Sequence, residues 1–310
     1  MADIRIALYL LAVLVVAARL SSAPPVQAQD AVVTVLAAGD IARCGEPWWP
    51  KPLKSLWEAP GAPLTAGLLD RLPGTVLALG DLVYDKETAE AHHDCYDATW
   101  GRHRERTRPV PGNHDYRNDG ATYFAYWGAR AGEAGHGYYS FELGAWHLIA
   151  LNSNIDLGPD SDQGRWLRAD LAASRARCIL AYWHHPLFTS GKHHDKKPKA
   201  APLFRLLYEA GASVVLNGHG HNYERFAPQD TEGRVDPKRG IRSFVVGTGG
   251  VPLRGIVRHK QNSEAFNSEA WGLLQLKLYE GRYAWRFIPI EGGSFSDSGT
   301  APCVARDRPG

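Results

Sequence analysis

The chain has 310 residues, of which 44% are hydrophobic, so it can form one large domain with a substantial core or two small ones. Its formal net charge at pH 7 is +2 with both signs well mixed, which gives no reason to expect nucleic-acid binding. The one local concentration of charge is the basic stretch 192–199, whose composition is typical of a solvated loop.

The N-terminal segment has the order of features found in secretory signal peptides. Arg5 precedes an apolar run from Ile6 to Ala18, and the small-residue sequence Val26-Gln27-Ala28 follows. We expect a signal peptide over residues 1–28, with cleavage after Ala28. The apolar run is shorter than the roughly 20 residues of a membrane span, although an uncleaved anchor is the alternative. The sequence therefore predicts a secreted or periplasmic protein with no membrane contact after cleavage.

Short apolar segments rich in β-branched residues alternate with helical patterns along the rest of the chain. The predicted strands are residues 32–38, 75–79, 107–110, 178–183 and 213–216, and the predicted helices are residues 64–72, 163–176 and 202–210. Two further pairs of strands flank Gly144-Ala145 and Glu280-Gly281 and indicate hairpins. These patterns predict an α/β fold, a four-layer α-β-β-α sandwich of two stacked mixed sheets.

The domain organisation is predicted to be simple. No Pro/Ser-rich linker and no internal repeat divides the sequence. We expect one domain over residues 30–295, followed by a polar, disordered tail over residues 296–310.

Each of the five predicted single strands ends in residues that can ligate metal ions. In chain order the segments are Gly39-Asp40, Gly80-Asp81-Leu82-Val83-Tyr84, Gly112-Asn113-His114-Asp115, His184-His185-Pro186 and Gly218-His219-Gly220-His221. One Gly-Asp pair is typical of a turn, but five such segments in one register predict a common crevice at the carboxyl ends of the strands. The donors suffice for two metal ions, an arrangement that favours phosphate-ester hydrolysis.

In this order the motifs resemble those of the calcineurin-like metallophosphoesterase superfamily. Tyr84, three residues after Asp81, resembles the purple acid phosphatase branch, and residues 222–225 are similar to the family's continuation after its last histidine. The resemblance extends over about residues 35–250 and departs from the family at Ala42, where Gly or His is usual. It implies an exported enzyme that hydrolyses phosphate monoesters by metal-activated hydroxide at acidic pH.

The resemblance also implies a role for each candidate ligand. The first metal ion, Fe(III), would be held by Asp40, Asp81, Tyr84 and His221. The second, Fe(II), Zn(II) or Mn(II), would be held by Asp81, Asn113, His184 and His219, with Asp81 bridging the two ions. The adjacent His185 is expected to be a supporting or structural residue.

Further residues are candidates for catalysis and substrate binding. His114 is expected to be catalytic, with Asp115 orienting it. By resemblance, His193 and His194 would bind the substrate phosphate and protonate the leaving group, with Asn113 also on the substrate side. We expect residues 152–154, which follow the first predicted hairpin, to line the same face.

Other functions remain open at this stage. A phosphodiesterase or nucleotidase could use the same scaffold, and a non-catalytic metal-binding or phosphate-binding protein is a further alternative. The run Pro47-Trp48-Trp49-Pro50 could form either the rim of the cleft or a docking patch for another protein. The expected partner is a small-molecule phosphate ester, whereas the oligomeric state is not predicted.

The four cysteines are Cys44, Cys95, Cys178 and Cys303. In an exported protein they allow two disulfides with three possible pairings. We favour Cys44 with Cys95, because each lies in a loop after a metal-motif strand, which leaves Cys178 with Cys303. Their wide spacing argues against a thiolate zinc site.

Overall fold

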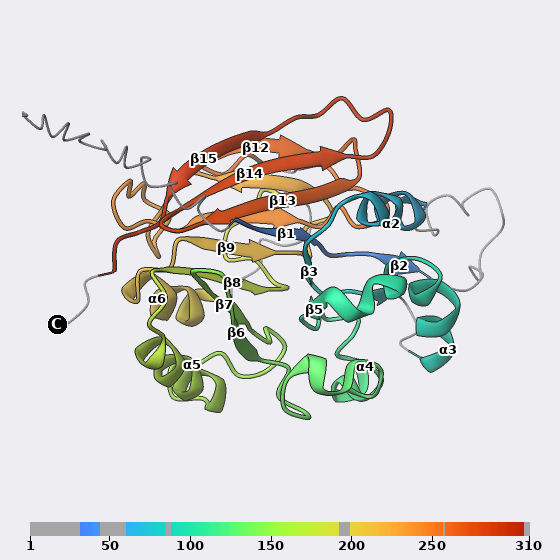
Figure 1. Cartoon of the computed structure of the whole chain (residues 1–310), viewed down its shortest axis with the longest axis horizontal. Coiled ribbons are helices and arrows are strands. Elements are labelled where there is room, and N and C mark those ends of the chain that lie inside the picture. Colours follow the sequence, from blue (N-terminus) through green and yellow to red (C-terminus); the bar gives the residue numbers. More distant parts are fainter. Residues whose placement is uncertain (1–31, 44–59, 85–87, 192–198, 257, 307–310) are drawn as a thin grey trace, which may run out of the picture.

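Two mixed β-sheets form the centre of the protein, and helices lie outside them (Figure 1). The structure, a computed structural model, describes residues 32–43, 60–84, 88–191, 199–256 and 258–306. In spatial order the six-stranded sheet contains β15 (Ser298–Pro302), β14 (Arg282–Pro289), β13 (Gly272–Tyr279), β1 (Val33–Ala38), β3 (Thr75–Ala78) and β5 (Thr107–Pro109). The seven-stranded sheet contains β12 (Ser263–Asn267), β10 (Tyr223–Phe226), β11 (Arg242–Val246), β9 (Val214–Asn217), β8 (Cys178–Trp183), β7 (Trp146–Ala150) and β6 (Tyr139–Leu143).

Within each sheet, the strands that precede the candidate ligands run parallel to one another. β1, β3 and β5 run parallel in the first sheet, and β7, β8, β9 and β11 run parallel in the second. The apolar runs of β8 and β9 are buried on both faces, as is usual for parallel strands covered on each side. The two predicted hairpins form antiparallel pairs, β6 with β7 and β13 with β14.

Large aromatic side chains pack the two sheets against each other. The ring centroids of Trp146 and Tyr283 lie 5.8 Å apart, those of Phe244 and Trp285 6.0 Å apart, and those of Tyr223 and Phe287 4.7 Å apart. In each pair one ring comes from the seven-stranded sheet and the other from β14. The core therefore lies between the sheets, where these rings bury a large apolar area.

Helices cover the outer faces of the sheets. The longer ones are α2 (Gly61–Arg71), α4 (Ala121–Trp127), α5 (Asp162–Ala173) and α6 (Ala201–Glu209), and α3 (Ala89–Ala91) is a single turn that continues into a π-helix, η2 (His92–Asp97). Three 3₁₀ segments are η3 (Trp100–Arg106), η4 (Arg117–Gly120) and η5 (Gly128–Ala131). Helix α2 contacts β13, whereas Leu167 of α5 and Phe204 of α6 belong to an apolar cluster with β8. The α/β sandwich with two stacked mixed sheets is thus confirmed.

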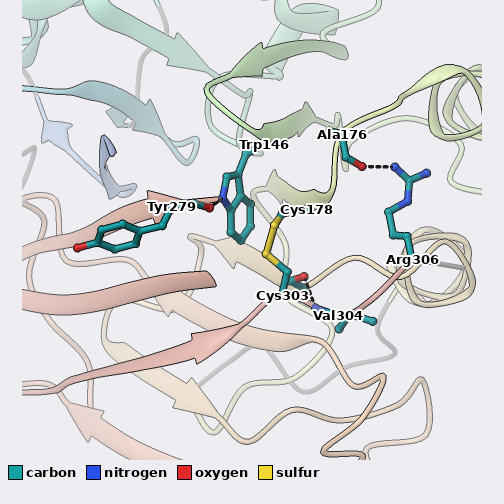
Figure 2. Close-up of a disulfide and its surroundings, with 8 residues drawn as sticks. Trp146, Ala176, Cys178, Tyr279, Cys303, Val304 and Arg306 are labelled. Carbon is teal, nitrogen blue, oxygen red and sulfur yellow. Dashed lines mark hydrogen bonds between the residues drawn. A yellow bond between two sulfur atoms is a disulfide. The ribbon is translucent and has the colours of Figure 1, made fainter. Parts of the chain in front are cut away.

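The C-terminal segment differs from the expected disordered tail. Residues 298–302 form β15, which pairs with β14, and Cys303 then forms a disulfide with Cys178 at the start of β8 (Figure 2). Beyond it, the Val304 amide donates to Ser213 Oγ, and Arg306 donates to the carbonyl of Ala176. A polar edge strand can form here because backbone pairing and a covalent link replace the missing apolar side chains.

Some sequence predictions fall outside the described residues, among them the signal peptide, the Trp48-Trp49 run and Cys44. Cys95 is in a disulfide. Its predicted partner, Cys44, lies outside the described residues. The Cys178–Cys303 pairing is confirmed. In the described ranges, no helix has both the length and the apolar character needed to cross a membrane.

Candidate metal centre

The five candidate ligand segments meet at the carboxyl ends of β1, β3, β5, β8 and β9. Backbone hydrogen bonds join the loops directly, since the Asp40 amide donates to the carbonyl of Gly80 and the Gly218 amide donates to that of His184. After Asp40 and Asp81 the two chains continue side by side as a short parallel ribbon, β2 (Ala42–Arg43) with β4 (Val83–Tyr84). This ribbon carries Tyr84 back to the end of β1.

One group of polar side chains gathers around the hydroxyl of Tyr84. This hydroxyl lies 2.6 Å from Oδ1 of Asp40 and 3.0 Å from Nε2 of His221, and Nε2 of His221 lies 3.3 Å from the same Asp40 oxygen. All three side chains are buried. A carboxylate, a phenol and an imidazole thus surround one point and present the three donors predicted for the first metal ion besides Asp81.

A second group gathers around Asp81. Nε2 of His184 lies 3.4 Å from Oδ2 of Asp81, and Nδ1 of His219 lies 3.2 Å from Nε2 of His184. The donor atoms of Asp40, Asp81 and His184 all lie within 4.8 Å of one another, which brings the two groups into a single site. Asn113 follows β5 at the same edge, and its side chain is exposed.

Backbone carbonyls orient two of the imidazoles. Nδ1 of His184 lies 2.8 Å from the carbonyl oxygen of Leu79, and Nδ1 of His221 lies 3.1 Å from that of Pro252. A carbonyl accepts only, so each Nδ1 carries a proton and Nε2 is the nitrogen that can bind a cation. Buried carboxylates and imidazoles whose Nε2 atoms face inward are a suitable donor set for two hard or borderline metal ions.

The charges within the site shift several pKa values in the metal-free protein. Burial by itself raises the pKa of Asp81, but the charge and hydrogen bond of His184 outweigh this and hold it well below its usual range. Burial likewise lowers the pKa of His184, yet Asp81 raises it to about 9. Burial, with the charges of Asp40 and Asp81, raises the pKa of the Tyr84 phenol well above 10. A phenolate at Tyr84 therefore requires a strongly charged cation beside it.

The ligand loops adopt backbone conformations that side chains rarely accept. Asp40, Asp81 and His219 have φ values of 61°, 52° and 67°, in the left-handed region. Such strain collects at functional sites, where the surrounding structure holds it in place. Gly112 is required for a related reason, because a Cβ there would lie 2.1 Å from Oδ1 of Asp81. The fold thus gives up local stability to keep the ligands in this arrangement.

The sequence of residues 33–223 matches the family model described as calcineurin-like phosphoesterase, a range that contains all five ligand segments. The chain belongs to this family. In the plant Arabidopsis thaliana, purple acid phosphatase 15 is 29% identical over 62% of this chain and 43% of its own length, and purple acid phosphatase 21 is 32% identical over 70% and 54%. This calcineurin-like phosphoesterase therefore spans about half the length of these curated relatives.

A solved structure supports the fold. Purple acid phosphatase PPD1 from yellow lupin (Lupinus luteus) seeds superimposes on this phosphoesterase with a TM-score of 0.72 and 18% sequence identity, over 88% of this chain and 54% of that one. The predicted resemblance to purple acid phosphatases is thus confirmed at the level of sequence relatives and fold.

The predicted catalytic residues occupy different parts of the site. The His114 amide donates to Oδ1 of Asp81, and its ring, 20% exposed, lies 4.2 Å from the ring of Tyr84 between centroids. Asp115 is buried, and its carboxylate accepts from the amides of Leu82 and Gly112. Asp115 therefore joins the loops that carry Asp81 and Asn113. His193 and His194 lie outside the described residues.

The structure adds two contacts that the sequence did not predict. Nη2 of Arg117 lies 3.2 Å from Nδ1 of His114, the residue that Asp115 was expected to orient. Ser153, in the loop after β7, contacts Nδ1 of His185 at 2.8 Å. No sequence motif contains a signal for Arg117. Ser153 belongs to residues 152–154, which were expected to line this face, but its contact with His185 was not predicted.

Proposed function

We propose that this chain is a phosphatase that hydrolyses phosphate monoesters at a centre of two metal ions. The first, Fe(III), would be held by Asp40, Asp81, Tyr84 and His221, and the second, Fe(II), Zn(II) or Mn(II), by Asp81, Asn113, His184 and His219. When bound, the two ions would supply Lewis-acid activation of the attacking water and charge for the phosphoryl oxygens.

One observation supports this proposal above the others, the contact of the Tyr84 hydroxyl with both Asp40 and His221. In a structural role a buried tyrosine needs one hydrogen-bond partner. Here the hydroxyl lies between a carboxylate and an imidazole whose other nitrogen faces the carbonyl of Pro252. That arrangement suits a phenolate ligand of a trivalent ion, and it agrees with the purple acid phosphatase relatives.

The residues around the metals have distinct roles in this proposal. His114 reaches the solvent side of the site, where its ring can donate a hydrogen bond to the leaving oxygen as negative charge develops on it. Arg117 donates to Nδ1 of His114, so the proton of the neutral ring lies on Nε2, the nitrogen that would make this hydrogen bond. Asp115 keeps the loops of Asp81 and Asn113 together. His193 and His194 are retained as proposed contacts for the substrate phosphate.

A comparison of substrates tests the reaction class. We expect the metal-loaded protein to hydrolyse para-nitrophenyl phosphate faster than bis(para-nitrophenyl) phosphate. Faster cleavage of the bis ester would favour the phosphodiesterase alternative. No cleavage of either ester between acidic and mildly alkaline pH would favour a non-catalytic metal-binding or phosphate-binding protein.

We also propose that the protein works outside the cytoplasm. The charged and apolar N-terminal sequence favours export, and the Cys178–Cys303 disulfide is expected to persist in an oxidising compartment. Mass spectrometry of the mature protein, expressed with its own N-terminus, would test cleavage after Ala28.

A further inference from the structure

His185 lies beside the two histidines proposed for the second metal ion. The donor nitrogens of His184, His185 and His219 are all within 4.8 Å of one another, and the ring centroid of His185 is 4.4 Å from that of His219. Unlike the fully buried His184, His185 is partly exposed. Its imidazole therefore lies where the candidate ligand groups meet solvent.

Ser153 fixes the orientation of this imidazole. Its Oγ lies 2.8 Å from Nδ1 of His185, and it also accepts from the His185 amide at 3.2 Å. The Ser153 oxygen accepts from the amide, and the hydroxyl can donate its own hydrogen to Nδ1, which uses both functions of the hydroxyl on one residue. The neutral ring then carries its proton on Nε2, the nitrogen on the side of the ring away from Ser153.

The loop that carries Ser153 is itself firmly held. The buried side chain of Gln163, in α5, accepts from the amide of Asn152 at 2.7 Å and donates to its carbonyl at 3.0 Å. Asn154 donates to the carbonyl of Pro111, next to the loop of Asn113. On the other side, the indole of Trp183 donates to the His185 carbonyl at 2.7 Å. These hydrogen bonds fix the backbone beside Ser153 and at His185, so the Ser153–His185 pair is pre-organised.

We propose that His185, held by Ser153, is a substrate-binding residue whose Nε2–H donates to an oxygen of the phosphate group at the second metal ion. This inference rests on the proposed two-metal phosphatase function. A rigid N–H donor beside the ligands is suited to a phosphate anion, since hydrogen bonds to charged groups are the stronger ones. Because His184 and His219 already supply imidazole ligands there, His185 acts on the anion and not on the metal.

Binding of inorganic phosphate to the zinc-loaded protein tests this directly, by calorimetry and without turnover. His185→Ala should weaken phosphate binding by about tenfold or more. Ser153→Ala should weaken it less, Ser153→Thr should restore it, and His185→Gln should retain part of it through an amide N–H. His93→Ala removes an exposed histidine from η2 and serves as the matched control with unchanged affinity.

Metal content, measured by elemental analysis on the same samples, separates the other outcomes. We expect two metal ions per chain in His185→Ala, as in the wild type. A loss of metal would overturn the proposal and make His185 a metal ligand, and unchanged phosphate affinity would overturn it as well. If the wild type binds phosphate with this dependence on His185 but cleaves no ester, the inference stands and the proposed function fails. If the wild type binds no phosphate, the inference itself is wrong.

Discussion

The hydroxyl of Tyr84 donates to Oδ1 of Asp40 across 2.6 Å, although the two residues lie in separate loops. The contact forms because the chain after Asp40 and the chain after Asp81 pair as the β2–β4 ribbon, which turns Tyr84 toward the end of β1. It connects Tyr84, whose spacing after Asp81 resembles the purple acid phosphatases, with Asp40, the first candidate ligand in the sequence. The predictions that follow start from this contact.

Tyr84→Phe should remove the visible colour of the iron-loaded protein. The phenol oxygen is the group that would give a charge-transfer band with Fe(III), and phenylalanine keeps the ring but loses that oxygen. Absorption spectra of purified wild type and variant measure the effect. Tyr208→Phe, which removes a hydroxyl bound to Asp236 outside this site, is the control and should keep the band. A band that persists in Tyr84→Phe would falsify the assignment of this ligand.

Asn113→Ala should lower the occupancy of the second metal ion while the first remains bound. Asn113 is an exposed donor after β5, and Asp40, Tyr84 and His221 do not depend on its side chain. Losing one ligand should lower the affinity for the second metal ion by about tenfold or more. Elemental analysis after dialysis gives the ratio of metal to protein. Two full equivalents of metal in the variant would contradict the ligand assignment.

Replacing both Cys178 and Cys303 with alanine should lower the free energy of unfolding by about 2–5 kcal/mol. The disulfide closes a sequence separation of 125 residues and links β8 to the segment after β15, so the unfolded chain gains freedom when it is lost. Cys178 begins β8, whereas His184 follows the end of that strand, so kcat at 25 °C should not change. Urea unfolding and steady-state kinetics measure the two effects, and a large loss of kcat would indicate unexpected coupling to the site.

His92 should make the protein less stable in acid. Its ring is 1% exposed and stacks on Tyr126 with centroids 4.6 Å apart, and burial lowers its pKa from 6.5 to about 4. Because the pKa of His92 is lower in the folded state than in the unfolded state, the folded state favours the neutral ring. The free energy of unfolding is therefore unaffected by His92 above pH 6.5 and decreases as the pH falls toward 4, where the unfolded state takes up the proton first.

The loss amounts to about 3 kcal/mol at most, from 1.36 kcal/mol per pKa unit. His92→Phe should therefore lose less stability than the wild type between pH 7 and pH 4. Urea unfolding at a series of pH values gives the free energy of unfolding of both proteins. The difference between them removes the effects of the other titrating groups, which both proteins share. Parallel stability curves for the two proteins would show that His92 does not contribute.

Local pattern determined much of the fold. The sequence predicts a buried strand over Cys178–Trp183, and β8 has the same bounds. A short, continuous apolar run bounded by turn signals is typical of a buried strand. The end strand β15 was missed, because its Ser-Gly-Thr-Ala-Pro sequence has no strand pattern. It exists through pairing with β14 and the disulfide at Cys303, which are properties of distant segments.

The sequence by itself determined the family and the candidate ligands, because each ligand type directly follows a predicted strand in a fixed order. Only the tertiary structure decided which side chains meet. Tyr84 joins Asp40 and His221, Asp115 binds the backbone of neighbouring loops, and Ser153 holds His185. Ser153 and His185 are 32 residues apart and come together because β7 and β8 are parallel neighbours. Local sequence encodes where a strand ends, whereas the packing of the sheets sets which strand ends become neighbours.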